Sequence, residues 1–159
     1  MSGKSKPMTN NDILRRIRYV FDFKDQEVIK IFDLAKSQIT QEELINYFRQ
    51  EEHPEYKNCS DKTLATFLNG LITKMRGESD GPKKEIEKKL DNNIIFKKLK
   101  IALNLKAEEV LDILKLVDFE FGKHELSALF RKKGHKHYRN CHDQVLRNFL
   151  NGLQKKYRS

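Results

Sequence analysis

The chain has 159 residues, of which 38% are hydrophobic and 35% are charged, and its formal net charge is +9. No apolar run approaches the roughly 18 residues that cross a bilayer, and residues 1–10 lack the apolar stretch of a signal peptide. These features exclude an integral membrane protein, and we expect a cytoplasmic globular protein with a disordered leader at residues 1–10.

Residues 11–76 carry apolar side chains spaced by three and four, which predicts four helices with one buried face each. We expect Asn11 to cap the first helix and Ser60 or Asp61 to cap the fourth. The residues expected on the buried faces, in chain order, are Ile13, Leu14, Ile17, Val20, Phe21, Val28, Ile31, Phe32, Leu34, Ala35, Leu44, Tyr47, Phe48, Leu64, Phe67, Leu68, Leu71, Ile72 and Met75.

Boundary signals refine the third and fourth helices. Thr40 followed three residues later by Glu43 predicts a capping box at the start of the third helix. That helix should end near Glu52, because Pro54 disfavours helical geometry in the residue before it. Gly77 should end the fourth helix.

The first helical unit returns after a polar linker at residues 77–92. Residues 11–71 align with residues 93–153 at a constant offset of 82 and without a gap. The helices expected in the second unit are Ile94 to Leu103, Ala107 to Asp118, Lys123 to Lys133, and Asp143 to about Lys156. We therefore predict an all-α protein of two tandem homologous units, residues 11–76 and 93–159, packed with pseudo-twofold symmetry.

Each unit keeps a glycine inside its last helix, Gly70 and Gly152. A glycine costs about 1 kcal/mol relative to alanine inside a helix, so a packing reason is expected. One hypothesis is that the two long helices cross at these glycines. The alternative is that each glycine accommodates a bulky side chain of its own copy.

A loop motif, His-x-x-Tyr-x-Asn-Cys-x-Asp, occurs at residues 53–61 and again at residues 135–143. If the two loops met, two histidines and two cysteines would offer the ligands of a zinc site: His53, Cys59, His135 and Cys141. The spacing is not that of a zinc finger. In the alternative interpretation the cysteines are buried, the aspartates cap the last helix, and the other side chains satisfy loop backbone groups. We expect no cofactor, and the sequence leaves metal binding by these four residues open.

The two loops diverge in charge, which is the strongest functional signal. Residues 49–57 form an acidic segment with Glu51, Glu52 and Glu55, whereas residues 131–139 form a basic one. Lysine, arginine, histidine and tyrosine side chains close together suit contacts with phosphates and stacking with bases. The candidate nucleic-acid-binding residues are Lys123, Arg131, Lys132, Lys133, His135, Lys136, His137, Tyr138, Arg139 and Arg147.

Other interpretations of the sequence stand beside this hypothesis. The basic segment is a solvated face, or it pairs with the acidic loop within the protein, across a homodimer, or with an acidic protein partner. The second and third helices of each copy have the outline of a helix-turn-helix.

An enzymatic function finds little support in the sequence. Phosphate-binding loops, nucleophile elbows and paired catalytic carboxylates are absent from it, and we assign no catalytic residue. Nucleophilic catalysis by Cys141 beside His135, His137 or His142 stays open.

The chain resembles the bacterial YehS family of uncharacterised proteins with a duplicated helical domain. The resemblance rests on Asn11 to Arg15, on Cys59 to Asp61 followed by residues 67–71, on Asn92 to Ile95 with Lys97 to Lys100, and on Lys123 to Leu126 through Arg131. It covers nearly the whole chain apart from the leader. It implies a bacterial, cytosolic, all-helical protein, and it supplies no functional residues.

Overall fold

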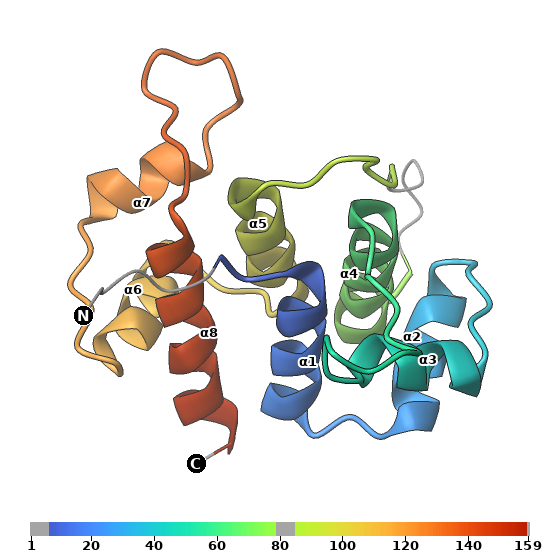
Figure 1. Ribbon diagram of the computed structural model, residues 1–159. Coiled ribbons are helices and arrows are strands. Elements are labelled where there is room, and N and C mark those ends of the chain that lie inside the picture. The colour runs from blue at the N-terminus through green and yellow to red at the C-terminus, as the bar shows by residue number, and fades with distance from the viewer. Residues whose placement is uncertain (1–6, 79–84, 159) are drawn as a thin grey trace.

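The computed structural model describes residues 7–78 and 85–158, and Figure 1 shows their arrangement. This part of the chain is all-α and contains no strand. The helices are α1 (Asn10–Phe21), α2 (Asp25–Leu34), α3 (Gln41–Phe48), α4 (Asp61–Arg76), α5 (Asn92–Ala102), α6 (Ala107–Lys115), α7 (Lys123–Leu129) and α8 (Asp143–Arg158). None of these described helices is both long and apolar enough to span a bilayer.

The predicted pseudo-twofold packing is confirmed, and it places helices of one copy against helices of the other. The first helix of each copy packs against the last helix of the other, so that α1 meets α8 and α5 meets α4. These four helices form the centre of the molecule, with α2 and α3 on one side and α6 and α7 on the other (Figure 1). One continuous apolar core therefore joins both copies.

The prediction that the two long helices cross at Gly70 and Gly152 is wrong. These glycines allow a close contact between helices of the same copy. A Cβ atom on Gly70 would collide with the backbone carbonyl of Ile31 in α2, and one on Gly152 would collide with the carbonyl of Ile113 in α6. Each glycine thus lets the last helix approach the second helix of its own copy, where a Cβ atom would meet the isoleucine backbone most closely and would also meet its side chain. The alternative, a contact with a bulky side chain of the same copy, is therefore correct in part.

Helix starts depart from the sequence prediction at α1. Thr9, not Asn11, caps this helix: its hydroxyl accepts from the Asp12 amide while the Asp12 carboxylate accepts from the Thr9 amide. The capping box of Thr40 and Glu43 is confirmed at α3. Ser60, one of the two expected caps, serves α4 by accepting from the Thr63 amide.

Glycine determines the end of α4, whereas tertiary contacts determine the ends of α3 and α7. Gly77 ends α4 with a φ of 83°, as predicted. In contrast, α3 ends at Phe48 instead of Glu52, because the Tyr47 carbonyl accepts from the side chain of Asn11. The same contact between the Leu129 carbonyl and Asn93 ends α7 before the predicted Lys133.

The linker is anchored where the structure describes it. Residues 85–91 form no helix, and within them the Glu85 carbonyl accepts from the side chain of Asn69. The Leu90 amide donates to the carboxylate of Asp61 over 2.9 Å. Residues 79–84 of the linker and residues 1–6 of the predicted leader lie outside the described ranges, while Met8 packs against the core.

Candidate nucleic-acid interface

The basic loop, defined as residues 131–139, is held at both ends by one buried asparagine. The side-chain amide of Asn93 donates to the carbonyls of Leu129 and Arg139 over 3.0 and 2.8 Å. Its carbonyl oxygen accepts from the Cys141 amide over 2.8 Å. The loop is thereby closed on α5 by three hydrogen bonds, two of them buried and one partly buried.

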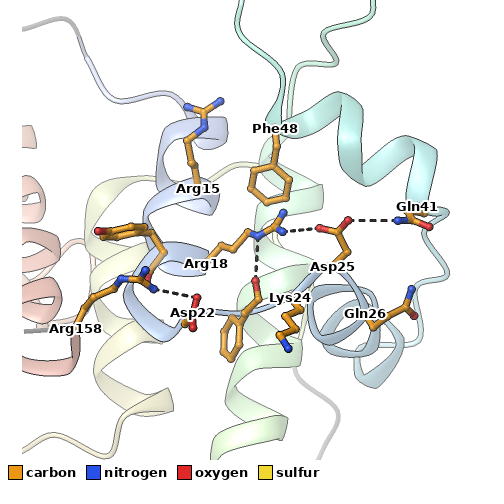
Figure 2. A pocket seen from close by; sticks show the side chains of 11 residues that line it. Arg15, Arg18, Asp22, Lys24, Asp25, Gln26, Gln41, Phe48 and Arg158 are labelled. Carbon is orange, nitrogen blue, oxygen red and sulfur yellow. Dashed lines mark hydrogen bonds and ion pairs between the residues drawn. The ribbon is translucent and has the colours of Figure 1, made fainter.

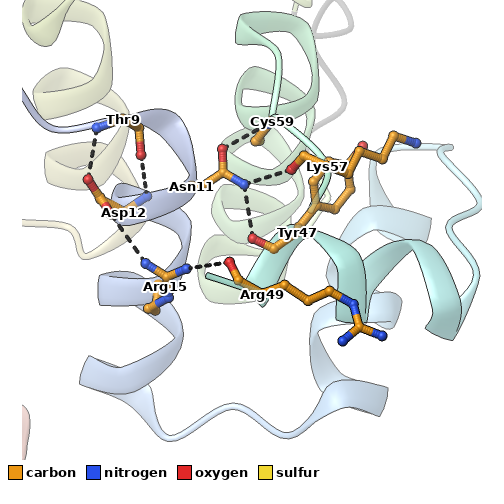
Figure 3. Close-up of polar contacts among 8 residues, drawn as sticks. All are labelled: Thr9, Asn11, Asp12, Arg15, Tyr47, Arg49, Lys57 and Cys59. Carbon is orange, nitrogen blue, oxygen red and sulfur yellow. Dashed lines mark hydrogen bonds and ion pairs between the residues drawn. The ribbon is translucent and has the colours of Figure 1, made fainter. Parts of the chain in front are cut away.

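The first copy contains the same anchor, shown in Figure 3. Asn11 donates to the carbonyls of Tyr47 and Lys57 and accepts from the Cys59 amide, each over 2.9 Å. Asn11, which the sequence predicts as a helix cap, aligns with Asn93 at the offset of 82 residues. The presence of asparagine in both copies was the available signal for a specific tertiary contact. Several residue types can cap a helix, so a cap alone would not require the same residue twice.

Between its anchored ends the basic loop makes two tight turns. The His135 amide donates to the Lys132 carbonyl, and the Tyr138 amide donates to the His135 carbonyl. Gly134 lies within the first turn with a φ of 99°, a conformation that favours glycine. Local hydrogen bonds therefore order the loop although it projects away from the helices (Figure 1).

Most of the predicted binding residues come together on this loop and face solvent. The exposed members are Arg131, Lys132, Lys133, His135, Lys136, His137 and Arg139. Tyr138 is only half-buried, and partial desolvation raises the pKa of its hydroxyl. The rings of His135 and His137 lie 5.5 Å apart.

Two of the predicted residues lie elsewhere. Lys123 is exposed at the opposite end of α7 from the loop and pairs with Glu108 at 3.5 Å. Arg147 is in α8, and its charge, together with stronger desolvation, lowers the pKa of Arg16 in α1. Arg147 thus belongs to the seam between the copies.

Carboxylates do little to neutralise the loop. Within the described residues only Asp91 lies at ion-pair distance from it, with its Oδ2 atom 3.8 Å from the Lys133 ammonium, which is itself 80% exposed. An exposed pair of this kind contributes about 0–1 kcal/mol. Asp91, which no motif in the sequence indicated, also accepts from the Ile94 amide and caps α5.

The corresponding loop of the first copy, residues 49–57, keeps the backbone plan with opposite charge. Its lysine, Lys57, pairs with Glu43 at 3.2 Å, and the guanidinium of Arg49 contacts the His53 ring. The glutamates of this acidic loop, Glu51, Glu52 and Glu55, are exposed. No ion pair between described residues joins the acidic loop to the basic loop, so the two do not neutralise each other within the chain.

The zinc hypothesis is not supported by the arrangement. Nowhere in the described ranges do three or more histidine, cysteine or acidic side chains gather as a metal site. Cys59 and Cys141 are buried, whereas His53 and His135 face solvent. Burial also raises the pKa of the Cys141 thiol to about 12, which disfavours the thiolate that nucleophilic catalysis needs.

The helix-turn-helix outline is wrong as well. Residues 116–122 separate α6 from α7, and residues 35–40 separate α2 from α3. Both connections exceed the three or four residues of a helix-turn-helix. The exposed cations predicted to bind nucleic acid therefore lie mainly on the basic loop and not on a recognition helix.

Comparisons with known proteins agree with the duplicated fold. The family model described as "Protein of unknown function (DUF1456)" matches residues 10–77 and, a second time, residues 92–159. The chain is 39% identical over 147 residues to the uncharacterized protein YehS of Escherichia coli (strain K12), covering 92% of this chain and 94% of that relative. No solved structure matches the chain.

Proposed function

This chain belongs to the DUF1456 family of proteins of unknown function, and from its geometry we propose that it is a non-catalytic protein that binds RNA or DNA. The basic loop contacts the phosphate backbone. The observation that carries the proposal is an ordered, projecting loop with five exposed cations, only one of which has a carboxylate at ion-pair distance among the described residues.

Physical chemistry favours a polyanion as the partner of such a loop. Each cation that neutralises a phosphate releases condensed counterions, so that several exposed cations in a short segment give a large entropic gain. The turn hydrogen bonds and the Asn93 anchor reduce the ordering cost on binding. The half-buried Tyr138 offers a smaller stacking surface than the sequence suggested, so backbone contacts dominate the proposed interface.

The test is fluorescence anisotropy with labelled single-stranded and duplex RNA and DNA of equal length, over a range of salt concentrations. The triple variant K132E/K133E/K136E should lose binding. Its matched control, K30E/K36E/K62E, makes the same change in net charge at exposed positions of the first copy and should retain it. Equal loss in both variants would show a net-charge effect and would reject the loop as the interface.

A second candidate is self-association, in which the acidic loop of one molecule meets the basic loop of another. The exposure of both loops and the absence of an ion pair between them within the described chain favour it. Such a contact uses different surfaces on the two molecules and builds head-to-tail chains. Light scattering at low and high salt distinguishes the candidates: salt-sensitive assembly without affinity for nucleic acid supports self-association.

A further inference from the structure

A groove of about 670 Å³ opens at the end of α1, and no residue of the basic loop lines it. Figure 2 shows side chains from α1, α2 and α3 of the first copy lining it, together with Arg158 from the last turn of α8. Both copies therefore build the groove. Its volume lies within the range of small-molecule sites.

The charged side chains of the groove are unequal in sign. Four cations line it, Arg15, Arg18, Lys24 and Arg158, against the two carboxylates of Asp22 and Asp25. The remaining positive charge lies in a concave surface, where the field is stronger than at an isolated exposed cation.

Two of the arginines are fixed by partners that leave further N–H groups available. Arg18 donates through Nη2 to Asp25 over 2.5 Å and through Nε to the Phe23 carbonyl over 3.0 Å. Its guanidinium carbon lies 4.6 Å from the centre of the Phe48 ring. Within the described chain its Nη1 donates no hydrogen bond.

Arg158 repeats this arrangement on the other side of the groove. Its Nη1 donates to the Tyr19 carbonyl over 3.0 Å and pairs with Asp22 at 3.0 Å. The guanidinium carbon is 4.0 Å from the centre of the Tyr19 ring. Its Nε and Nη2 have no hydrogen-bond partner in the described part of the chain.

Arg15 and Lys24 add adjustable charge at the rim. Arg15 precedes Arg18 by one helical turn, so both emerge from one face of α1. The Arg15 side chain is 43% exposed and contacts Asp12 and the Arg49 carbonyl. The Lys24 ammonium is exposed and has no ion-pair partner among the described residues.

We propose that this groove binds a small phosphate-bearing anion. Phosphate oxygens accept charge-assisted hydrogen bonds from several donors at once, and guanidinium groups match that geometry. Since carboxylates and rings already hold Arg18 and Arg158, little side-chain freedom is lost on binding. The guanidiniums also cover one face each of the Phe48 and Tyr19 rings, so a base cannot stack on those faces.

The experiment is an NMR titration of the full chain with inorganic phosphate and, separately, pyrophosphate, with sodium chloride adjusted to hold ionic strength constant. We expect saturable shifts of the backbone amides of Lys24, Asp25 and Gln26, with the amides of residues 131–139 unchanged. The R15Q/K24Q double variant should bind about tenfold more weakly, because it loses charge-assisted hydrogen bonds. K30Q/K62Q, which removes two exposed lysines outside the groove, is the matched control.

The outcomes separate this inference from the proposed function. The K132E/K133E/K136E variant should bind pyrophosphate as the native chain does, whether or not the chain binds nucleic acid. Shifts that do not saturate, shifts spread over all exposed cations, or equal affinity of R15Q/K24Q would overturn the proposal. Groove shifts that respond to an oligonucleotide but to neither small anion would also reject it.

Discussion

The Lys98 ammonium in α5 donates a hydrogen bond to the side-chain oxygen of Asn69 in α4 over 2.6 Å. Arg16 in α1 makes the equivalent bond to Asn151 in α8, so the contact is repeated at the offset of 82 residues. Each pair joins the two copies, because the cation comes from the first helix of one copy and the asparagine from the last helix of the other. Lys98 also pairs with Glu87 of the linker at 3.1 Å.

Replacing Lys98 with alanine should destabilise the fold. Lys98 is only 9% exposed, and its removal leaves the side-chain oxygen of Asn69 and the carboxylate of Glu87 without this cation. We expect a loss of about 2–3 kcal/mol in the free energy of unfolding, measured by urea denaturation. The adjacent Lys97 is exposed, so Lys97→Ala is the control and should change stability by less than about 0.5 kcal/mol. Similar losses in both variants would contradict the bridging role.

Gly70→Ala and Gly152→Ala should each destabilise the protein by about 1–3 kcal/mol, in spite of alanine's higher helix propensity. The new methyl group would collide with the Ile31 or Ile113 backbone and push α2 or α6 away from the core. Thermal unfolding measures the effect. Gly122→Ala provides the contrast, because its Cβ meets only the end of the flexible Glu125 side chain. A gain in stability from Gly70→Ala would show that the α4 and α2 backbones do not approach each other closely at Gly70 and Ile31.

Asn93→Ala should weaken both the fold and the proposed interface. It leaves the Leu129 and Arg139 carbonyls and the Cys141 amide without their partner, at a cost of about 3 kcal/mol. Hydrogen exchange should then accelerate across the basic loop, and nucleic-acid affinity should fall. Asn11→Ala breaks the equivalent anchor of the acidic loop and should leave affinity unchanged at a temperature where both variants are folded. Equal loss of affinity in the two variants would argue against a role for the basic loop.

The two cysteines should make stability fall at alkaline pH. Burial raises the pKa of the Cys59 and Cys141 thiols to about 12, whereas thiols in an unfolded chain titrate near about 8.5. The unfolded state therefore loses protons first, and the stabilisation present below about pH 8.5 disappears as the pH rises toward 12. Urea denaturation between pH 8 and 11 should show a shallower decline for a Cys59→Ala/Cys141→Ala double variant. Parallel curves would rule out a contribution from the thiols.

Asp91→Asn should strengthen nucleic-acid binding by about two- to threefold at low salt, because it removes the carboxylate nearest Lys133. The gain in affinity is small because the lost interaction is an exposed ion pair. Asparagine retains the ability to cap α5, so stability should change little. Fluorescence anisotropy measures the affinity, and the difference should shrink as salt rises. Glu51→Gln removes one charge from the acidic loop and serves as the control; the same gain from that variant would show a general charge effect.

Local signals in the sequence were sufficient for the helices and for their repetition. Apolar spacing placed Leu64, Phe67 and Leu71 on the buried face of α4, where they are fully covered. Thr40 with Glu43 and Gly77 marked helix ends correctly, because these motifs act through hydrogen bonds or dihedral angles within one turn. The offset of 82 residues predicted two equivalent units before any contact was known.

Tertiary structure decided the contacts that each repeated residue makes. The Asn-Gly pair of α4 serves two partners at once: Gly70 receives the α2 backbone of its own copy, whereas Asn69 accepts from Lys98 of the other. Helical periodicity shows that a face is buried but not what lies against it, since that depends on how distant segments close around one core. Asn11 was predicted to be a cap because the sequence shows only its position near the start of a helix. The folded chain brings its side chain to the carbonyls of Tyr47 and Lys57.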